Sequence, residues 1–278
     1  MKGEWKLRKE IVEICRLMHE KGFISATDGN VSVRLSSDRI LTTPSGKGKG
    51  FLTENELVVV DYEGNLISGD LPPSSEIKMH LIAYRLRPDV NAVVHAHPPV
   101  AVALTIAGLS LAKCILPEVV LTLGVIPTAR YATPSTEEVP ESIKDLLPHH
   151  DAILLERHGS VTLGRDLLDA YYKLEKIEHT AHITYLARQL GEVSTLTESQ
   201  IEKLLAISGA DETKRSVLCV HCGACGREDP PHKEEAFSPT EVHLRTEGGR
   251  SSSPPHPPSP EELIELIREE VIKELKRR

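Results

Sequence analysis

The sequence predicts a mixed α/β fold, and two observations support this prediction. Several long segments carry apolar residues at helical spacing, and several short apolar segments are bounded by turn residues, as strands are. The N-terminal segment of the 278-residue chain is of the first kind: Ile11, Cys15, Leu17 and Met18 give it an apolar face, and Gly22 is placed to end the helix. We find no internal repeat.

The later elements follow in order along the chain. Short apolar runs between turn residues predict strands at Val31–Leu35, Ile40–Thr42, Leu57–Asp61, Ala92–His95 and Ala152–Leu155. Helical spacing predicts helices at Ile77–Arg87, Pro99–Ile106 and Asp166–Gln189. The first of these stops before Pro88, because the residue before a proline disfavours helical backbone.

Composition narrows the class of function. The net charge of −8, with no basic stripe, argues against a nucleic-acid surface. The N-terminus mixes charged and apolar residues, so we expect neither a signal peptide nor a membrane span, and we predict a cytoplasmic protein. In that reducing compartment the five cysteines are interpreted as free thiols or metal ligands rather than disulfides.

A pair of histidines, His95 and His97, ends the fourth predicted strand. Residues i and i+2 of a strand point to the same side, so both imidazoles can reach one ion. His158, which follows another apolar strand and precedes the small Gly159, is the candidate third ligand of an open catalytic zinc site. The alternative is that these histidines only cap strands or lie in loops.

Five ordered motifs carry a resemblance to the class II aldolase/adducin family over about residues 5 to 205: Thr27-Asp28-Gly29-Asn30-Val31-Ser32-Val33-Arg34, Thr43-Pro44-Ser45-Gly46, Pro73-Ser74-Ser75-Glu76, Val93-Val94-His95-Ala96-His97 and His158-Gly159. The resemblance implies a three-layer α/β/α fold with a mostly antiparallel central sheet. It also implies a homotetramer with active sites between subunits and one Zn²⁺ per subunit.

The resemblance further implies roles for small and acidic residues. Positions that hold the substrate phosphate in the family are matched by Gly29, Asn30, Ser45, Gly46, Ser74 and Ser75. The serine pair also precedes a predicted helix, whose N-terminus favours negative charge. Glu76 matches the family's catalytic glutamate, which binds zinc at rest and then moves a proton. Without the resemblance, Glu76 would be interpreted as a capping carboxylate.

The implied activity is zinc-dependent retro-aldol cleavage of a ketose 1-phosphate, either L-fuculose 1-phosphate or L-rhamnulose 1-phosphate, to dihydroxyacetone phosphate and lactaldehyde. Two other functions stay open. One is a sugar-phosphate dehydratase or 4-epimerase on the same metal scaffold. The other is an adducin-like binding protein without catalysis, which the complete set of histidines and Glu76 disfavours.

The chain departs from the family at one position. Fuculose-type aldolases carry a proton-donating tyrosine that would fall near Leu116, and no tyrosine is present there. Glu118 lies near an acidic acid–base residue of related methylthioribulose-1-phosphate dehydratases, so we interpret it as a second acid–base group. The alternatives are a surface carboxylate at Glu118 and a donor role for Tyr131.

Four segments are expected along the chain: a catalytic domain at 1–207, a Cys-rich segment at 208–228, a flexible Pro/Ser linker at 229–258, and an amphipathic helix at 259–278. The spacing of Cys219, Cys222 and Cys225 indicates a second metal or an iron–sulfur cluster, with exposed thiols as the alternative.

The terminal helix begins with a capping signal at Ser259 and carries apolar residues on one face, which need a partner. Together with the disordered linker, this helix resembles an encapsulation peptide that binds a shell protein of a bacterial microcompartment. The alternative is a helix that packs on the enzyme itself. We expect no nucleic-acid partner and no membrane.

Overall fold

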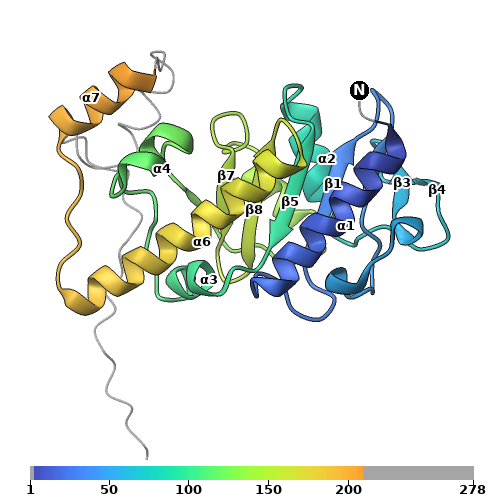
Figure 1. The fold of residues 1–278 in the computed structure, drawn as a ribbon, viewed down its shortest axis with the longest axis horizontal. Coiled ribbons are helices and arrows are strands. Elements are labelled where there is room, and N and C mark those ends of the chain that lie inside the picture. The colour runs from blue at the N-terminus through green and yellow to red at the C-terminus, as the bar shows by residue number, and fades with distance from the viewer. Residues whose placement is uncertain (1–2, 209–278) are drawn as a thin grey trace, which may run out of the picture. The chain divides into compact units, whose positions relative to one another are not determined.

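The computed structural model describes residues 3–208, which form an eight-stranded sheet with helices on both sides (Figure 1). The strand order is β4-β3-β2-β1-β5-β8-β7-β6. The strands are β1 (Asn30–Arg34), β2 (Ile40–Thr42), β3 (Val58–Val60), β4 (Leu66–Ser68), β5 (Ala92–Ala96), β6 (Thr128–Ala129), β7 (Ala152–Leu155) and β8 (Gly159–Gly164).

The sheet is mixed in direction. β6 runs parallel to β7, whereas the other neighbouring pairs among the described strands are antiparallel. The α/β class predicted from the sequence is confirmed. We expected a mostly antiparallel sheet. The parallel pair of β6 and β7 makes the sheet mixed instead.

Alternating side chains of the strands build two separate hydrophobic layers. Val94 of β5 packs toward α1 (Glu4–Glu20) and α6 (Leu167–Leu190). Its neighbour Val93 packs on the opposite face, toward α2 (Ile77–Leu86) and α5 (Glu138–Ile143). This alternation is the period of two expected of a strand with both faces covered. In Figure 1, α1 and α6 lie in front of the sheet and α2 lies behind it.

The remaining helices surround the β7 side of the sheet. They are α3 (Pro99–Ile106), α4 (Pro117–Thr122) and α7 (Glu198–Ser208). Two short 3-10 turns, Lys49–Phe51 and Glu54–Glu56, pack against α1 instead. α3 packs against α6, and α4 packs against α7. No helix within residues 3–208 is long and apolar enough to cross a membrane.

The structure adds elements that the sequence pattern did not predict: the helices α4, α5 and α7, the edge strands β4 and β6, and the central strand β8. β8 lies between β5 and β7, so the two strands that carry the site histidines are not direct neighbours. Its sequence begins and ends with glycine, a residue that is depleted in strands, and this explains why it was missed. The predicted strands and helices agree with the observed ones to within one or two residues at each end.

The predictions for the C-terminal extension lie outside the described residues. These are the ligand set of Cys219, Cys222 and Cys225, the linker at 229–258 and the helix at 259–278.

Candidate active site

β5 and β8 fix the position of His95. His95 lies opposite Val161 in the antiparallel ladder and is fully buried. Its Nδ1 is 2.9 Å from the backbone carbonyl oxygen of Ser160, which can only accept a hydrogen bond. Nδ1 therefore carries the proton, and the lone pair of Nε2 is directed into the site.

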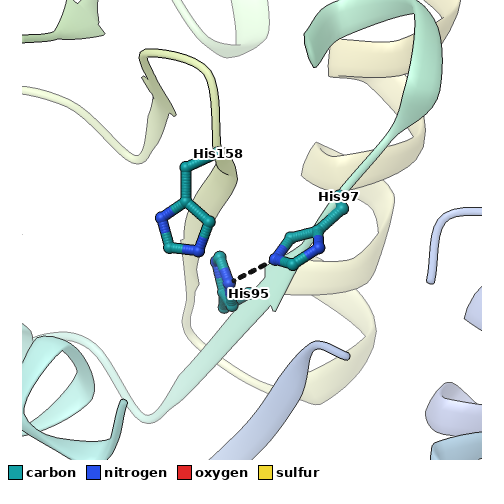
Figure 2. Close-up of side chains that lie close together, drawn as sticks. All are labelled: His95, His97 and His158. Carbon is teal, nitrogen blue, oxygen red and sulfur yellow. Dashed lines mark hydrogen bonds between the residues drawn. The ribbon is translucent and has the colours of Figure 1, made fainter. Parts of the chain in front are cut away.

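The other two histidines come from the ends of strands. His97 lies one residue beyond β5, where its backbone N–H donates to the Phe23 carbonyl over 2.8 Å. His158 lies in the tight turn between β7 and β8, next to Arg157, which adopts a left-handed backbone conformation with φ 57°. Figure 2 shows the three imidazoles converging, with a dashed line between His95 and His97.

This convergence is close enough for a shared ion. One ring nitrogen from each of His95, His97 and His158 lies within 4.8 Å of the others. Nε2 of His95 and Nε2 of His97 are only 3.0 Å apart. Burial and the neighbouring imidazoles lower the pKa of His97 to about 4, so its ring is neutral at pH 7, as a metal ligand must be.

Gly159 allows this approach because it has no side chain. A Cβ at this position would lie 2.4 Å from the carbonyl oxygen of Ala96 and 2.7 Å from Cδ2 of His97. Any larger residue would therefore push β8 away from the end of β5. From the sequence, Gly159 was expected to leave room beside His158. The structure shows that the room is needed for Ala96 and His97.

Glu76 completes the cluster from α2, which packs on the face of the sheet that His95 shares with Val93. It is the N-cap residue of α2, and its side chain is 13% exposed. Its Oε2 is 3.2 Å from Nε2 of His95, and its Oε1 is 3.1 Å from Nε2 of His158. Burial raises the pKa of the Glu76 carboxyl, but a proton on the neighbouring imidazoles of His95 and His158 outweighs burial and holds the pKa well below its usual range. Glu76 is therefore an anion facing the histidines.

The donor set fits a divalent cation. Buried Oε1 of Glu76 has no hydrogen-bond partner, although it lies beside His158. Buried polar atoms without partners are rare, and a ligand ion is one explanation. Three imidazole nitrogens and one carboxylate match the ligands and number preferred by zinc.

Three loops that the sequence analysis assigned to phosphate binding are joined by hydrogen bonds. Thr43 exchanges backbone and side-chain hydrogen bonds with Val31, which ties the loop at 43–46 to the loop at 27–30. The backbone N–H of Ser45 donates to the Pro72 carbonyl over 2.9 Å, and Pro44 pairs with Pro73, which leads into Ser74 and Ser75.

Two glycines of these loops have backbone conformations that favour glycine. Gly29 has φ 72° and Gly46 has φ 68°. A Cβ on Gly29 would lie 2.6 Å from Cγ2 of Ile24, so this position has no room for a side chain either. The loops thus present backbone with little side-chain bulk, which suits close approach of an anion.

Two residues assigned by sequence are not brought into this cluster. Glu118 is exposed in the first turn of α4, and within residues 3–208 no hydrogen bond or ion pair joins it to the histidines or Glu76. Tyr131 is 56% exposed, and its backbone N–H donates to Glu156. The proton-donor roles of Glu118 and Tyr131 stay predictions.

The sequence analysis missed a buried polar network beside Glu76. Oγ of Ser32 lies 2.7 Å from Nδ1 of His80 and 2.8 Å from the hydroxyl of Tyr84. Burial lowers the pKa of His80 to about 3. His80 follows Glu76 by four residues, the spacing that places two side chains on one helical face, and this signal was available in the sequence.

Comparisons with known proteins identify the family of this chain. The family described as Class II Aldolase and Adducin N-terminal domain matches residues 9–185. An L-fuculose phosphate aldolase of Methanococcus maripaludis is 35% identical over 181 residues, which are 65% of this chain and 97% of that protein.

Two further relatives cover more of the chain. A 3-oxo-tetronate 4-phosphate decarboxylase of Haemophilus influenzae is 34% identical over 202 residues, 71% of this chain and 95% of that protein. The crystal structure of YgbL from Klebsiella pneumoniae superposes with a TM-score of 0.68 at 32% identity, covering 73% of this chain and 100% of that one.

Proposed function

Because this chain belongs to the Class II Aldolase and Adducin N-terminal domain family and is a metal-dependent lyase of the class II aldolase type, we propose that it cleaves a ketose 1-phosphate. The substrate is L-fuculose 1-phosphate or L-rhamnulose 1-phosphate, and the products are dihydroxyacetone phosphate and lactaldehyde. The observation that carries this proposal is the convergence of His95, His97 and His158 on the carboxylate of Glu76.

The three histidines and Glu76 would hold one Zn²⁺. When bound, zinc supplies a Lewis acid that stabilises negative charge on the reacting substrate. The protein's own contribution begins with His95, because its bond to the Ser160 carbonyl keeps Nε2 unprotonated and ready to bind.

Glu76 is assigned the proton transfer. Breaking the C3–C4 bond of the ketose leaves its electron pair on C3, as the enediolate of dihydroxyacetone phosphate. The C4 hydroxyl loses its proton as it becomes the aldehyde group. Glu76, an anion at rest, accepts a proton and delivers it to C3, and in the direction of synthesis it removes that proton. A positioned carboxylate contributes typically about 10²–10⁴-fold to rate in such a step.

The phosphate group is assigned to the three joined loops. Their backbone N–H groups and the hydroxyls of Ser74 and Ser75 offer donors, and the glycines leave space for the anion. Holding the phosphate fixes the reacting carbon relative to Glu76, which reduces the entropic part of the barrier.

A second reaction is favoured by one observation: the decarboxylase relative matches 71% of this chain. Loss of carbon dioxide from a 3-oxo acid phosphate also leaves an enediolate that needs the same charge stabilisation and the same proton. The two proposals differ in the group that leaves, and they share the metal, the phosphate loops and Glu76.

A product assay separates these reactions. The purified full-length protein with zinc is incubated with L-fuculose 1-phosphate, L-rhamnulose 1-phosphate and 3-oxo-tetronate 4-phosphate. Dihydroxyacetone phosphate together with lactaldehyde supports the aldolase, and dihydroxyacetone phosphate with carbon dioxide supports the decarboxylase. A product without three-carbon fragments would indicate a dehydratase or epimerase. No turnover of any of the three would count against a sugar-phosphate lyase.

The assembly and the C-terminal extension complete the proposal. We propose a homotetramer in the cytoplasm, whose helix at 259–278 binds a shell protein of a microcompartment. The support is the family and the sequence pattern of the tail.

Light scattering tests the tetramer. Deleting 259–278 should leave activity in solution intact and abolish co-sedimentation with shells; unchanged co-sedimentation would contradict the shell role. Metal analysis of a Cys219→Ser variant tests the second metal or cluster.

A further inference from the structure

Lys49 is a buried lysine that joins two of the phosphate loops. Only 3% of the surface of this residue is accessible to solvent. Its Nζ donates to the Thr27 carbonyl over 2.9 Å and to the Lys47 carbonyl over 2.8 Å. Thr27 lies two residues before Gly29, and Lys47 directly follows Gly46. The ammonium group is therefore bound to the backbone of both glycine-containing loops.

This ammonium has no counter-ion in the part of the chain that the structure describes. Asp28 and Glu76 influence Lys49 electrostatically, but Asp28 lies 3.6 Å from His97, and Glu76 is directed at His95 and His158. Burial lowers the pKa of Lys49, and the charges of Asp28 and Glu76 offset only part of that effect. Lysines are almost never buried without a paired charge.

The neighbouring thiol does not balance the charge either. Cys15 interacts electrostatically with Lys49, but it is fully buried, and burial raises the pKa of its thiol to about 12. Cys15 is therefore neutral at pH 7. The two carbonyls accept two of the three N–H groups of Lys49, which leaves one donor and most of one positive charge unmatched.

We propose that Lys49 is the cation that matches the phosphate group of the substrate, so that it selects phosphorylated over unphosphorylated sugars. This inference rests on the proposed function, which supplies the sugar-phosphate substrate. Lys49 holds the loops of Gly29 and Gly46 together through backbone carbonyls and places a positive charge against their backbone. A dianion bound by the loops then meets a buried charge that water does not screen.

The inference is tested by phosphate binding, which needs no turnover. The affinity of the zinc-loaded full-length protein for inorganic phosphate is measured by calorimetry for wild type, K49M, K49Q and K21M. Lys21 is the matched control, since it is half exposed, is paired with Glu175 at 3.0 Å and lies outside the phosphate loops. We expect K49M and K49Q to weaken phosphate binding about tenfold or more, because a charge-assisted interaction is lost. K21M should stay within about twofold of wild type.

K49Q keeps a hydrogen-bond donor and loses the charge, so it separates the charge from the loop contacts. Circular dichroism and zinc content identify any variant that fails to fold. Thermal melts give a second measurement: phosphate should raise the melting temperature of the wild type and of K49R, and much less that of K49Q. Phosphate affinity of K49M and K49Q within twofold of wild type would overturn the inference, as would a wild type that binds no phosphate.

The failure of this inference is distinguishable from failure of the proposed function. In one outcome, K49Q binds phosphate more weakly but the wild type has no lyase activity. Lys49 would then be an anion-binding residue, and the proposed lyase function would be wrong. Lyase activity in the wild type with an unchanged KM in K49Q would keep the lyase and reject Lys49. If the lyase function and the role of Lys49 are both correct, K49Q should raise KM for the phosphorylated substrate by about tenfold or more, while kcat changes less.

Discussion

The side-chain amide of Asn30 donates a hydrogen bond to Oε2 of Glu76 over 3.1 Å. This bond crosses from β1 to the start of α2, two elements separated by more than forty residues of sequence. The same oxygen lies 3.2 Å from Nε2 of His95. A residue assigned to the phosphate pocket therefore also holds the carboxylate that is assigned the proton transfer, so both functions depend on one geometry.

Replacing Glu76 with glutamine should remove turnover and leave zinc bound. The amide keeps the shape of the side chain but cannot take up a proton, so we expect kcat to fall by about 10²–10⁴-fold. The three histidines should still hold the metal. Steady-state kinetics and metal analysis of E76Q, beside E192Q at an exposed position, check this. A kcat within a few-fold of wild type would remove the assigned role.

Replacing His95 with alanine should remove the metal. His95 is fully buried, and its Nε2 lies 3.0 Å from Nε2 of His97 and 3.2 Å from Oε2 of Glu76. Its loss leaves two imidazoles, so we expect zinc content near zero after dialysis and activity below detection. H179A, at an exposed histidine of α6, is the matched control. Full zinc occupancy in H95A would mean that the ion binds elsewhere.

Replacing Gly159 with alanine should disturb both stability and metal binding. The new Cβ would meet the Ala96 carbonyl at 2.4 Å, so β8 must shift relative to β5. Overpacking of this kind costs about 1–3 kcal/mol in the free energy of unfolding. G48A is the control, because its Cβ would make only ordinary contacts at 3.4 Å and 3.5 Å. Urea titrations and zinc affinity measure the two effects, and an unchanged zinc affinity would refute the steric argument.

His80 should make the protein less stable in acid. Its pKa is lowered by burial to about 3 in the folded protein, against 6.5 as the ordinary value. Below pH 6.5 the unfolded chain therefore binds a proton that the folded chain does not. The free energy of unfolding then falls as the pH drops from 6.5 toward 3, by roughly 1.4 kcal/mol per pH unit for this group.

The variant H80Q removes this titration. Urea unfolding at pH 6.5, 5.5 and 4.5 should show a shallower loss of stability for H80Q than for wild type, whatever the change at pH 6.5. His97 titrates in the same direction and is retained in both proteins, so the comparison isolates His80. H149Q, at an exposed histidine, should keep the wild-type slope. Equal slopes for wild type and H80Q would show that His80 does not carry the effect.

Local patterns were sufficient to predict most elements of the fold. The apolar segment before His95 was predicted as a strand because its length and composition suit one, and β5 extends it by only one residue. The segment after His158 was not predicted, although its residues 160–163 alternate polar and apolar side chains, because this run is short and has a glycine at each end. That segment becomes β8 only because β5 and β7 offer hydrogen-bonding partners on both sides.

The same limit applies to the site. The histidines could be found because an alternating pair at a strand end has a recognisable spacing, and the resemblance to a known family supplied Glu76. Lys49 had no local signal, since a lysine in a glycine-rich loop is usually exposed. Its burial depends on contacts with Thr27 and Lys47 that only the folded chain creates.

The central position of β8 has a consequence for how the protein matures. His95 and His158 face each other only after β8 has inserted between β5 and β7, and β8 ends at Gly164. A nascent chain that has not yet emerged past this residue lacks the framework that brings the imidazoles together. We therefore expect the site to bind an ion only after residue 164 has emerged, when all eight strands of the described sheet are available.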